Sequence, residues 1–275
     1  MNRTSPVIFI GAAEPGGCTL ISAPAGRATI PLMAVVTQEY VDIPVGDLAM
    51  RTFVAAPRSP GPHPAIVFYS DIFQLTEPTL RWCVRLASYG FLVAAPEIYH
   101  RIEPSGTVLA FDDEGKARGQ RDAETTPVAH FDADAAAALD WLEERTGGAP
   151  LGAAGHCTGG HIAFRAAFDP RVRSIACWYP TGLHDGKLAA EPDAATLARA
   201  PEIKGDLLLI FGTRDPHTPE AGRQVVRRGV RDNKVTWLEY DAEHAFGRDI
   251  GPRYDPEITD EAFAQTVAHL RRTLA

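Results

Sequence analysis

The stretch Gly155-His156-Cys157-Thr158-Gly159-Gly160 lies between a short apolar run, residues 151–154, and an apolar segment with helical spacing, residues 162–168. It has the form Gly-x-nucleophile-x-Gly of a strand-to-helix turn, in which the nucleophile adopts a strained backbone conformation. The two glycines that flank Cys157 have no side chain, so the strand and the helix can pass close to each other. By itself the hexapeptide also fits a phosphate-binding turn or a buried structural cysteine, so its meaning depends on the rest of the chain.

Buried strands and helices alternate along the chain. Continuous apolar runs predict strands, and apolar residues at helical spacing predict helices between them. The expected strands are 65–69, 91–95, 151–154, 174–179, 206–211 and 234–240, and the expected helices are 76–89, 132–144, 162–168, 219–230 and 257–274. This alternation predicts an α/β fold with a mostly parallel central sheet covered by helices on both faces. Two shorter strands, 40–45 and 48–55, surround Gly46-Asp47 and predict an N-terminal β-hairpin.

Composition limits the class of protein. The chain has 275 residues, of which 45% are hydrophobic, and its net charge is -8. The acidic balance argues against a nucleic-acid partner, and no apolar run approaches the ~18 residues of a membrane span. The four cysteines are scattered, which is typical of thiols in a reducing compartment, so we expect a cytoplasmic protein without disulfides.

One domain is expected, preceded by an extension. Residues 1–32 are rich in Gly, Ala and Pro and contain one acid, Glu14. We predict that residues 1–37 form a disordered or loosely docked extension, with Met33 as an alternative start, and that residues 38–275 form the α/β domain. The segment 98–131 has little apolar periodicity, so we expect it to shape a site or to contain a short helix that periodicity does not reveal.

Two further polar residues follow predicted strands. Asp215 comes after strand 206–211, and His244 comes after strand 234–240. The carboxyl ends of parallel strands lie at one edge of a sheet, so Cys157, Asp215 and His244 are expected to converge there. Their order along the chain, nucleophile, then acid, then histidine, is that of a hydrolase triad. His217 is the rival base, but it shares a loop with Asp215 and cannot easily face Cys157 as well.

From about Gln38 to the C-terminus, the chain resembles the dienelactone hydrolase (carboxymethylenebutenolidase) family. The resemblance rests on four separated parts of the sequence: Asp71-Ile72-Phe73, Pro96-Glu97-Ile98-Tyr99-His100-Arg101, the hexapeptide around Cys157, and the Asp215 and His244 regions. It implies an α/β-hydrolase fold, a Cys-Asp-His triad and the opening of an enol-lactone ring in aromatic catabolism.

The same resemblance implies a role for each matching residue. Cys157 is the nucleophile, His244 the base, and Asp215 the residue that orients the base. The backbone amides of Thr158 and Ile72 are the expected oxyanion hole. Family members commonly carry Glu where this chain has Asp71, one methylene shorter, and that carboxylate contacts the resting thiol and helps to generate the thiolate.

Four further residues are candidates for substrate binding. The resemblance implies that Arg101 and Arg248 bind the carboxylate of the lactone, since a guanidinium can hold a carboxylate through two parallel hydrogen bonds. The alternative is that both arginines are partners in surface ion pairs. Trp178 and Tyr179 end a predicted strand, and they are equally compatible with a pocket wall and with core packing.

The residues therefore predict a hydrolase that opens a small activated ester or enol-lactone through an acyl-thioester. The alternatives are a broad-specificity carboxylesterase with the same triad and a non-catalytic binding or redox-sensing protein on a hydrolase scaffold. No cofactor and no metal are required by the mechanism. The expected partner is a small-molecule ester or lactone, with no nucleic acid and no membrane, and the chain is expected to be a monomer or a small homo-oligomer.

Overall fold

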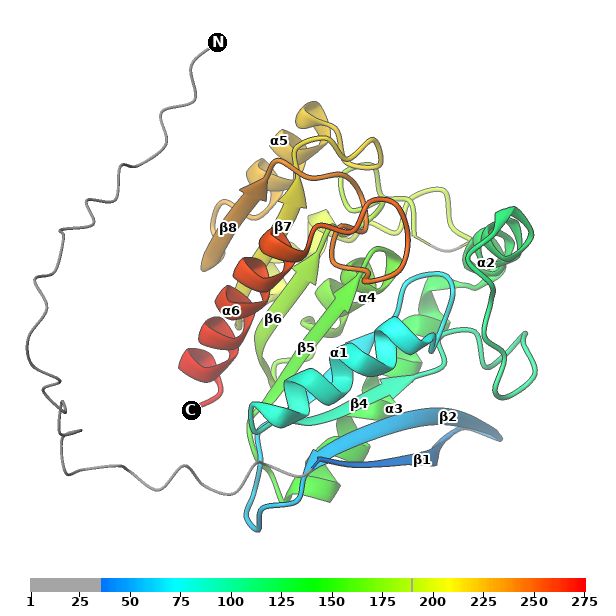
Figure 1. Ribbon diagram of the computed structural model, residues 1–275, viewed down its shortest axis with the longest axis vertical. Helices are drawn as coiled ribbons and strands as arrows, with labels where there is room; N and C mark the ends of the chain where they lie inside the picture. Colours follow the sequence, from blue (N-terminus) through cyan, green and yellow to red (C-terminus); the bar gives the residue numbers. More distant parts are fainter. Residues whose placement is uncertain (1–35, 189) are drawn as a thin grey trace, which may run out of the picture. The chain divides into compact units, whose positions relative to one another are not determined.

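The computed structural model describes residues 36–188 and 190–275. This part of the chain forms an eight-stranded sheet in the order β1-β2-β4-β3-β5-β6-β7-β8 (Figure 1). Strands β1 (Val36–Val45) and β2 (Leu48–Pro57) pair antiparallel as a hairpin, and β2 pairs antiparallel with β4 (Leu92–Pro96). From β4 to β8 every neighbouring pair is parallel. The mostly parallel sheet and the N-terminal hairpin are therefore confirmed.

The central strands lie between two helical layers. They are β4, β3 (Ala65–Tyr69), β5 (Leu151–His156), β6 (Val172–Trp178) and β7 (Asp206–Gly212), and β8 (Val235–Tyr240) is the half-buried edge strand beside β7. Successive side chains of a strand point to opposite faces. In β3, Val67 packs into one hydrophobic core and Phe68 into the other. This double burial explains why β3 reads in the sequence as one uninterrupted apolar run.

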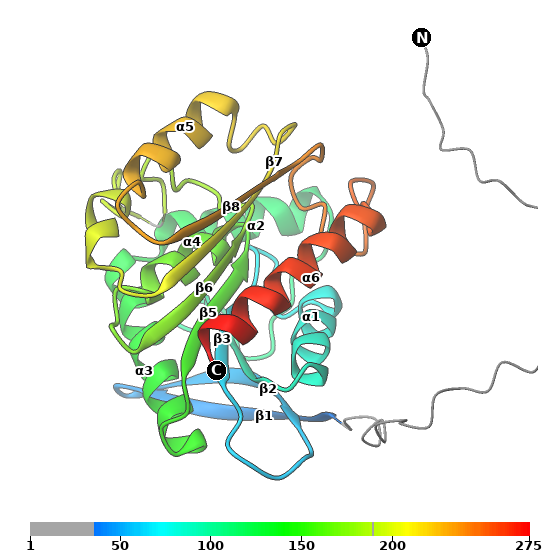
Figure 2. The same cartoon turned by 90° about the vertical axis from the view of Figure 1, so that its left-hand side faces the viewer.

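Each face of the sheet has its own set of helices (Figure 2). On one side, α1 (Glu77–Ser88) and α6 (Pro256–Thr273) contribute Trp82 and Phe263 to the core. On the other side lie α3 (Val128–Thr146), α4 (Thr158–Ala166) and α5 (Glu220–Gly229). The predicted helices are all present, although α4 starts earlier than its apolar spacing indicates, directly after Cys157.

The segment 98–131 contains a helix that the sequence pattern did not reveal, α2 (Asp113–Thr125). The Asp112 side chain caps it by accepting a hydrogen bond from the Gly115 amide at 2.8 Å. The buried positions of α2 are Gly115, Gly119 and Asp122, none of which is a large apolar residue. The helix therefore has no apolar stripe, and hydrophobic periodicity cannot detect it.

Close approach of backbones explains the glycines of α2. A Cβ on Gly119 would lie 2.4 Å from the carbonyl oxygen of Ile72. The helix is thus held against the loop that follows β3. A 3-10 helix at Leu197–Glu202 was also not predicted, and it contains Pro201.

The predicted N-terminal extension, residues 1–37, lies outside the described residues except for its last two. Val36 and Thr37 belong to β1, so the strand begins two residues before the predicted boundary. Met33 and Cys18 are also outside the described residues. Across the part of the chain that the structure describes, no helix is both long and apolar enough to cross a membrane.

Candidate active site

The turn between β5 and α4 holds Cys157 in a strained conformation. Its backbone has φ 57° and ψ -123°, a positive φ that non-glycine residues rarely adopt. A Cβ on Gly155 would lie 2.3 Å from the Gly159 carbonyl oxygen, and one on Gly159 would lie 2.2 Å from that of Ser70. Both glycines are thus required for the close passage of strand and helix that the hexapeptide predicts.

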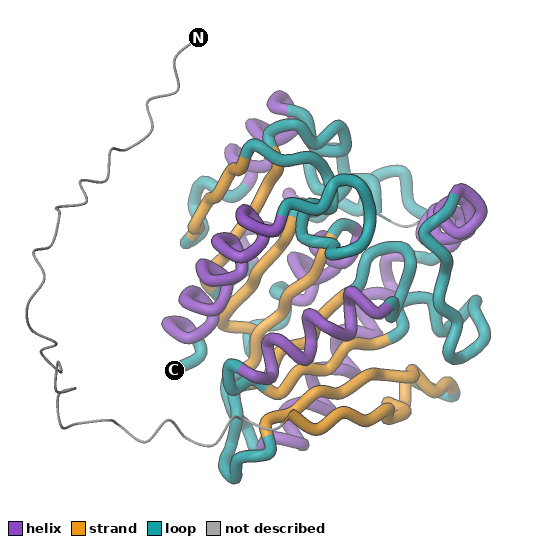
Figure 3. Tube along the Cα trace, in the orientation of Figure 1, coloured by secondary structure: helices purple, strands orange, loops and turns teal. Residues whose placement is uncertain are grey.

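The loops that follow β7 and β8 (teal in Figure 3) bring Asp215 and His244 together. His244 Nδ1 lies 2.7 Å from Asp215 Oδ2, and both side chains are buried. The other carboxylate oxygen of Asp215 accepts a hydrogen bond from the His217 amide at 2.8 Å. Burial disfavours the charged carboxylate, but the hydrogen bond and the charge of His244 outweigh it and lower the pKa of Asp215. Asp215 therefore contacts the imidazole directly, and its hydrogen bond and charge favour the charged form of His244.

The thiol and the imidazole stabilise each other's charged forms. Burial opposes ionisation of Cys157, but the positive charge of His244 and the hydroxyl of Thr181 lower the pKa of the thiol. Burial also disfavours an imidazolium, yet the Cys157 thiolate and Asp215 raise the pKa of His244 to about 9. Each group thus favours the charged form of the other, and the thiolate is the reactive form of a cysteine.

Thr181 is the contact of Cys157 that sequence reasoning missed. Its hydroxyl lies 3.3 Å from Cys157 Sγ, and its amide donates to the Cys157 carbonyl oxygen at 3.2 Å. Its own carbonyl lies 3.0 Å from Nδ1 of the buried His161, whose Nε2 lies 2.8 Å from the Thr196 hydroxyl. Thr181 lies three residues after the carboxyl end of β6. This position near a strand end was the only feature of the sequence that could have indicated a role for Thr181 in the site.

Asp71 is engaged by groups other than the thiol. One carboxylate oxygen accepts from the Phe73 amide at 3.0 Å, and the other accepts from Arg248 Nη1 at 3.2 Å. Burial raises the pKa of Asp71, and the charge of Arg248 partly opposes this. The family resemblance implies a contact between Asp71 and the thiol, but Asp71 is not among the hydrogen-bond partners of Cys157 Sγ. Those partners are the hydroxyls of Thr181, at 3.3 Å, and Thr158, at 4.0 Å.

The two expected oxyanion donors, Thr158 and Ile72, line the same cavity as Cys157. Thr158 is the first residue of α4, so its N–H has no partner within the helix. The backbone carbonyl of Ile72 packs closely against Gly119 of α2. The positions of both amides are compatible with stabilising an oxyanion.

Three of the four candidate substrate-binding residues are not brought to this cavity. Arg101 is paired through Nη2 with Asp134 of α3. Trp178 is buried, and its Nε1 donates to the Thr266 hydroxyl at 3.1 Å. Tyr179 is likewise buried in the core under α1 and α6. Arg101 is therefore an ion-pair partner, and both aromatic residues pack in the core. Of the four candidates, Arg248 lines the cavity.

The other histidines near the site have distinct environments. His156 packs edge-on against Phe68 and Trp82 beneath the turn, and burial lowers its pKa to about 3. Burial also lowers the pKa of His161, to about 4. The ring centroid of His217 lies 4.5 Å from that of His244, and His217 lines the cavity. His244 alone among them has both an acid partner and the raised pKa.

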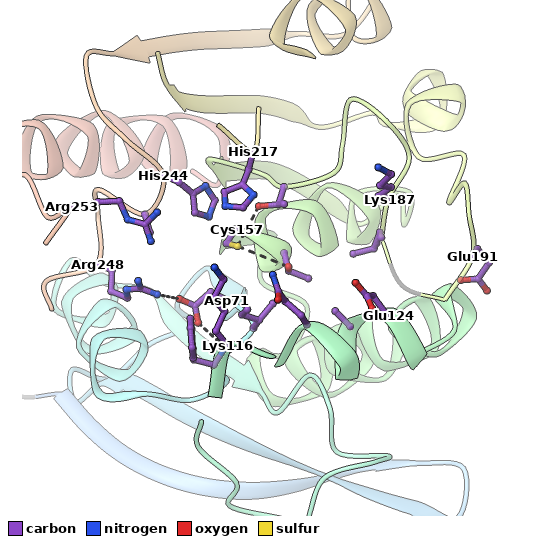
Figure 4. Close-up of a pocket in the computed structure, with 18 residues that line it drawn as sticks. Asp71, Lys116, Glu124, Cys157, Lys187, Glu191, His217, His244, Arg248 and Arg253 are labelled. Carbon is purple, nitrogen blue, oxygen red and sulfur yellow. Dashed lines mark hydrogen bonds and ion pairs between the residues drawn. The ribbon is translucent and has the colours of Figure 1, made fainter. Parts of the chain in front are cut away.

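The cavity above Cys157 has a volume of about 340 Å³ (Figure 4). Helix α2 supplies one wall through Lys116, Gln120, Ala123 and Glu124. The remaining lining residues that the sequence did not indicate come from loops: Phe73, Thr181, Lys187, Leu188, Glu191, Ala245 and Arg253. Apart from Phe73 and Ala245, which lie in segments that carry the family resemblance, none belongs to a motif. For the wall formed by α2, the only indication in the sequence was the low apolar periodicity of segment 98–131. Within residues 36–188 and 190–275, no group of three His, Cys, Asp or Glu side chains is arranged to hold a metal ion.

The fold and this geometry define the class of protein first. A mostly parallel sheet with Cys157 on the turn after β5, and with Asp215 and His244 after β7 and β8, has the α/β-hydrolase arrangement. Comparison with known proteins then narrows the class. The model of the dienelactone hydrolase family matches residues 50–274. The chain belongs to the dienelactone hydrolase family, and it is a hydrolase of that kind.

Relatives agree with this assignment. Two curated proteins that bear the name "Putative carboxymethylenebutenolidase" are similar to the chain. The one from Saccharomyces cerevisiae is 32% identical over 87% of this chain and 93% of its own length, and the one from Escherichia coli K12 is 27% identical over 96% and 94%. Among solved structures, a dienelactone hydrolase homologue from Klebsiella pneumoniae superimposes with a TM-score of 0.74 at 22% identity, over 86% of this chain and 99% of that chain. This last likeness concerns the fold alone.

Proposed function

We propose that the protein hydrolyses a small activated ester or enol-lactone, with Cys157 as nucleophile and His244 and Asp215 as its catalytic partners. One observation carries the proposal. The Asp215–His244 hydrogen bond of 2.7 Å lies beside a thiol with a lowered pKa, on a strained turn that opens into a cavity. Nucleophile, base and orienting acid are the three roles that covalent ester hydrolysis requires.

Acylation begins with attack of the Cys157 thiolate on the substrate carbonyl. The carbonyl oxygen gains the negative charge and is stabilised by the amides of Thr158 and Ile72. Collapse of this intermediate breaks the ester C–O bond, and the leaving oxygen takes the proton of the His244 imidazolium. In a lactone the leaving group stays attached to the acyl chain, so the ring opens on the enzyme.

Deacylation returns the enzyme to its resting state. Neutral His244, oriented by Asp215, takes a proton from water as the water oxygen attacks the thioester carbonyl. The thiolate then leaves, the carboxylic acid product loses its proton, and the thiolate–imidazolium pair is restored. No electrons are exchanged, and water is the only second substrate.

An activated leaving group suits this site. The imidazolium is stabilised by Asp215 and by the thiolate, so it is a weak acid with a pKa of about 9. An enolate leaves without much proton donation, whereas an amine leaving group demands it. The site therefore favours enol-lactones and activated esters over amides.

The alternative of a broad carboxylesterase uses the same three residues on neutral esters. The two proposed functions differ in the charge of the substrate. The cavity contains several cationic side chains, which favour an anionic substrate. Comparison of cis- and trans-dienelactone with neutral esters and lactones of similar size discriminates them. A cytoplasmic location and a monomeric or small homo-oligomeric state remain part of the proposal.

The test of the mechanism is the Cys157→Ala variant. We expect it to fold normally and to lose hydrolysis of p-nitrophenyl acetate and of dienelactone, including any burst of p-nitrophenol. Cys83→Ala is the matched control, since Cys83 is buried in α1 away from the cavity. Hydrolysis by Cys157→Ala at the wild-type rate would refute the proposed mechanism. Loss of turnover in both variants would show that the effect is not specific to Cys157.

A further inference from the structure

The loop that follows β6, residues 179–188 and 190–196, carries the hydroxyl closest to Cys157 Sγ. That hydroxyl belongs to Thr181, at 3.3 Å, and Leu188 of the same loop lines the cavity. Backbone strain occurs near both ends of the loop. Tyr179 has φ 37° and Ala195 has φ 52°, values that non-glycine residues rarely adopt. Such conformations persist only where surrounding contacts hold them, so the contacts at the two loop ends decide where the Thr181 hydroxyl lies.

One buried histidine of α4 contacts both ends of this loop. His161 Nδ1 lies 3.0 Å from the carbonyl oxygen of Thr181, and its Nε2 lies 2.8 Å from the hydroxyl of Thr196. The Cys157 carbonyl oxygen accepts from the amides of both His161 and Thr181, at 3.3 and 3.2 Å. His161 is therefore fixed to the turn that carries the thiol and, through its ring, to both ends of the loop.

The hydrogen bonds of the His161 ring have fixed directions. A carbonyl oxygen only accepts, so Nδ1 carries the proton that the Thr181 carbonyl receives. Burial lowers the pKa of His161 to about 4, so the ring is neutral and its Nε2 is an acceptor. The Thr196 hydroxyl must then donate to Nε2. A single neutral tautomer, protonated at Nδ1, satisfies both contacts.

Arg165, on the same face of α4, favours this tautomer from the other side. Its Nη1 donates to the Thr196 hydroxyl oxygen at 3.0 Å and to the carbonyl oxygen of the residue before Ala195 at 2.9 Å. A guanidinium has donors only, so the Thr196 oxygen accepts from it and the hydroxyl hydrogen is left for His161 Nε2. Asp132 of α3 holds the guanidinium through two hydrogen bonds, of 2.8 and 2.6 Å. The tautomer of His161 is thus set by a buried, charge-anchored network.

We propose that His161 is a positioning residue of this site: as its Nδ1–H tautomer, it holds the Thr181 backbone so that the Thr181 hydroxyl faces the Cys157 thiolate. Arg165 sets this tautomer through Thr196. The inference rests on the proposed role of Cys157 as nucleophile, and it extends the site to a residue that does not touch the sulfur. The two ring nitrogens of His161 therefore differ in importance, since only Nδ1 acts on Thr181.

Two substitutions separate the two ring nitrogens. The amide nitrogen of asparagine takes a position close to that of Nδ1, so His161→Asn can still donate to the Thr181 carbonyl but loses the contact with Thr196. The longer glutamine reaches the position of Nε2, so His161→Gln keeps the contact with Thr196 but leaves the Thr181 carbonyl without its donor. Glutamine is closer to histidine in volume, so a purely structural role of His161 would make His161→Gln the milder change. We expect the reverse.

The readout is the pH dependence of Cys157 alkylation by iodoacetamide, which follows the thiolate. The midpoint of His161→Asn should stay close to wild type. That of His161→Gln should rise, so that the alkylation rate below the midpoint falls by up to about tenfold, the loss expected when a hydrogen bond to the thiolate is removed. Thr181→Val in the His161→Gln background should cause little further loss, since both changes break one interaction. Equal midpoints in the two His161 variants, a larger rise in His161→Asn, or additive losses in the double variant would overturn the proposal.

His269→Asn is the matched control. His269 of α6 is also buried, and its Nε2 lies 3.1 Å from the backbone carbonyl oxygen of Asp206, at the amino end of β7. The variant removes a buried imidazole and a donor to a backbone carbonyl, and it should leave the Cys157 midpoint unchanged. A shift as large as that of His161→Gln would reveal a general effect of lost packing and would contradict the positioning role.

A measurement on the unaltered protein tests the tautomer directly. In ¹⁵N NMR spectra of the histidine rings, with the His161 signals identified by their loss in His161→Asn, Nδ1 should be protonated and Nε2 unprotonated at neutral pH. A protonated Nε2 would overturn the proposal. Neither this readout nor the alkylation midpoint depends on turnover. Hydrolysis that survives Cys157→Ala would therefore refute the proposed mechanism without altering the tautomer or the midpoints.

Discussion

The contact between Thr181 and Cys157 leads to a quantitative prediction. The Thr181 hydroxyl, 3.3 Å from the sulfur, can donate to the thiolate and stabilise it. Thr181→Val keeps the shape of the side chain but removes the donor. The thiolate then loses one of the groups that lower the pKa of Cys157, while His244 remains in place. We therefore expect the thiol pKa to rise in this variant.

The magnitude follows from the strength of the hydrogen bond. Hydrogen bonds to charged groups contribute about 1.5–3 kcal/mol. Cys157 is partly accessible from the cavity, so water can replace some of the loss, and the lower end, about 1.5 kcal/mol, applies. One pKa unit corresponds to about 1.4 kcal/mol, so the thiol pKa should rise by about one unit. Below the midpoint, the thiolate fraction should then fall about tenfold.

The assay is the pH dependence of Cys157 alkylation by iodoacetamide, measured at the modified peptide by mass spectrometry. In wild-type protein the midpoint should lie below 9.0, the ordinary thiol value, because His244 and Thr181 favour the thiolate. Thr181→Val should move the midpoint upward, and the rate at high pH should be preserved. Thr181→Ser keeps a hydroxyl and should remain close to wild type. The same midpoint in the Val variant and in wild type would refute the role of Thr181.

Three further variants test other parts of the site. Asp215→Asn should remove the charge that helps to hold the pKa of His244 near 9. We expect kcat/KM to fall by about 10²–10⁴-fold with an unchanged circular dichroism spectrum. A loss below threefold would contradict the orienting role of Asp215. Asp71→Asn should lower the thiol pKa and speed alkylation near neutral pH, because the Asp71 charge raises the pKa of Cys157. Slower alkylation would instead support a direct role of Asp71 in forming the thiolate. Gly159→Ala should destabilise the fold by more than about 3 kcal/mol in urea unfolding, since its Cβ would lie 2.2 Å from a backbone oxygen; a stable variant would show that the turn can relax.

Much of the fold could be predicted because its signals are local. A stretch of strand buried on both faces is apolar, so β3 and residues 207–211 of β7 are each visible in the sequence as a run of five apolar residues. Helix α2 was invisible for the opposite reason. Its buried face consists of an aspartate and two glycines that pack on backbone, and such a face leaves no hydrophobic period in the sequence.

The sequence by itself determined the sheet, the strained turn at Cys157, and the convergence of Asp215 and His244 at the strand ends. Parallel strands place their carboxyl ends together, so residue order and strand prediction suffice for these features. Only the tertiary structure decided the partners of these groups. Asp71 pairs with Arg248 across 177 residues, and Cys157 contacts Thr181 across 24. Contacts between loops depend on distances in the folded chain. Neither the periodicity nor the spacing of residues in the sequence predicts those distances.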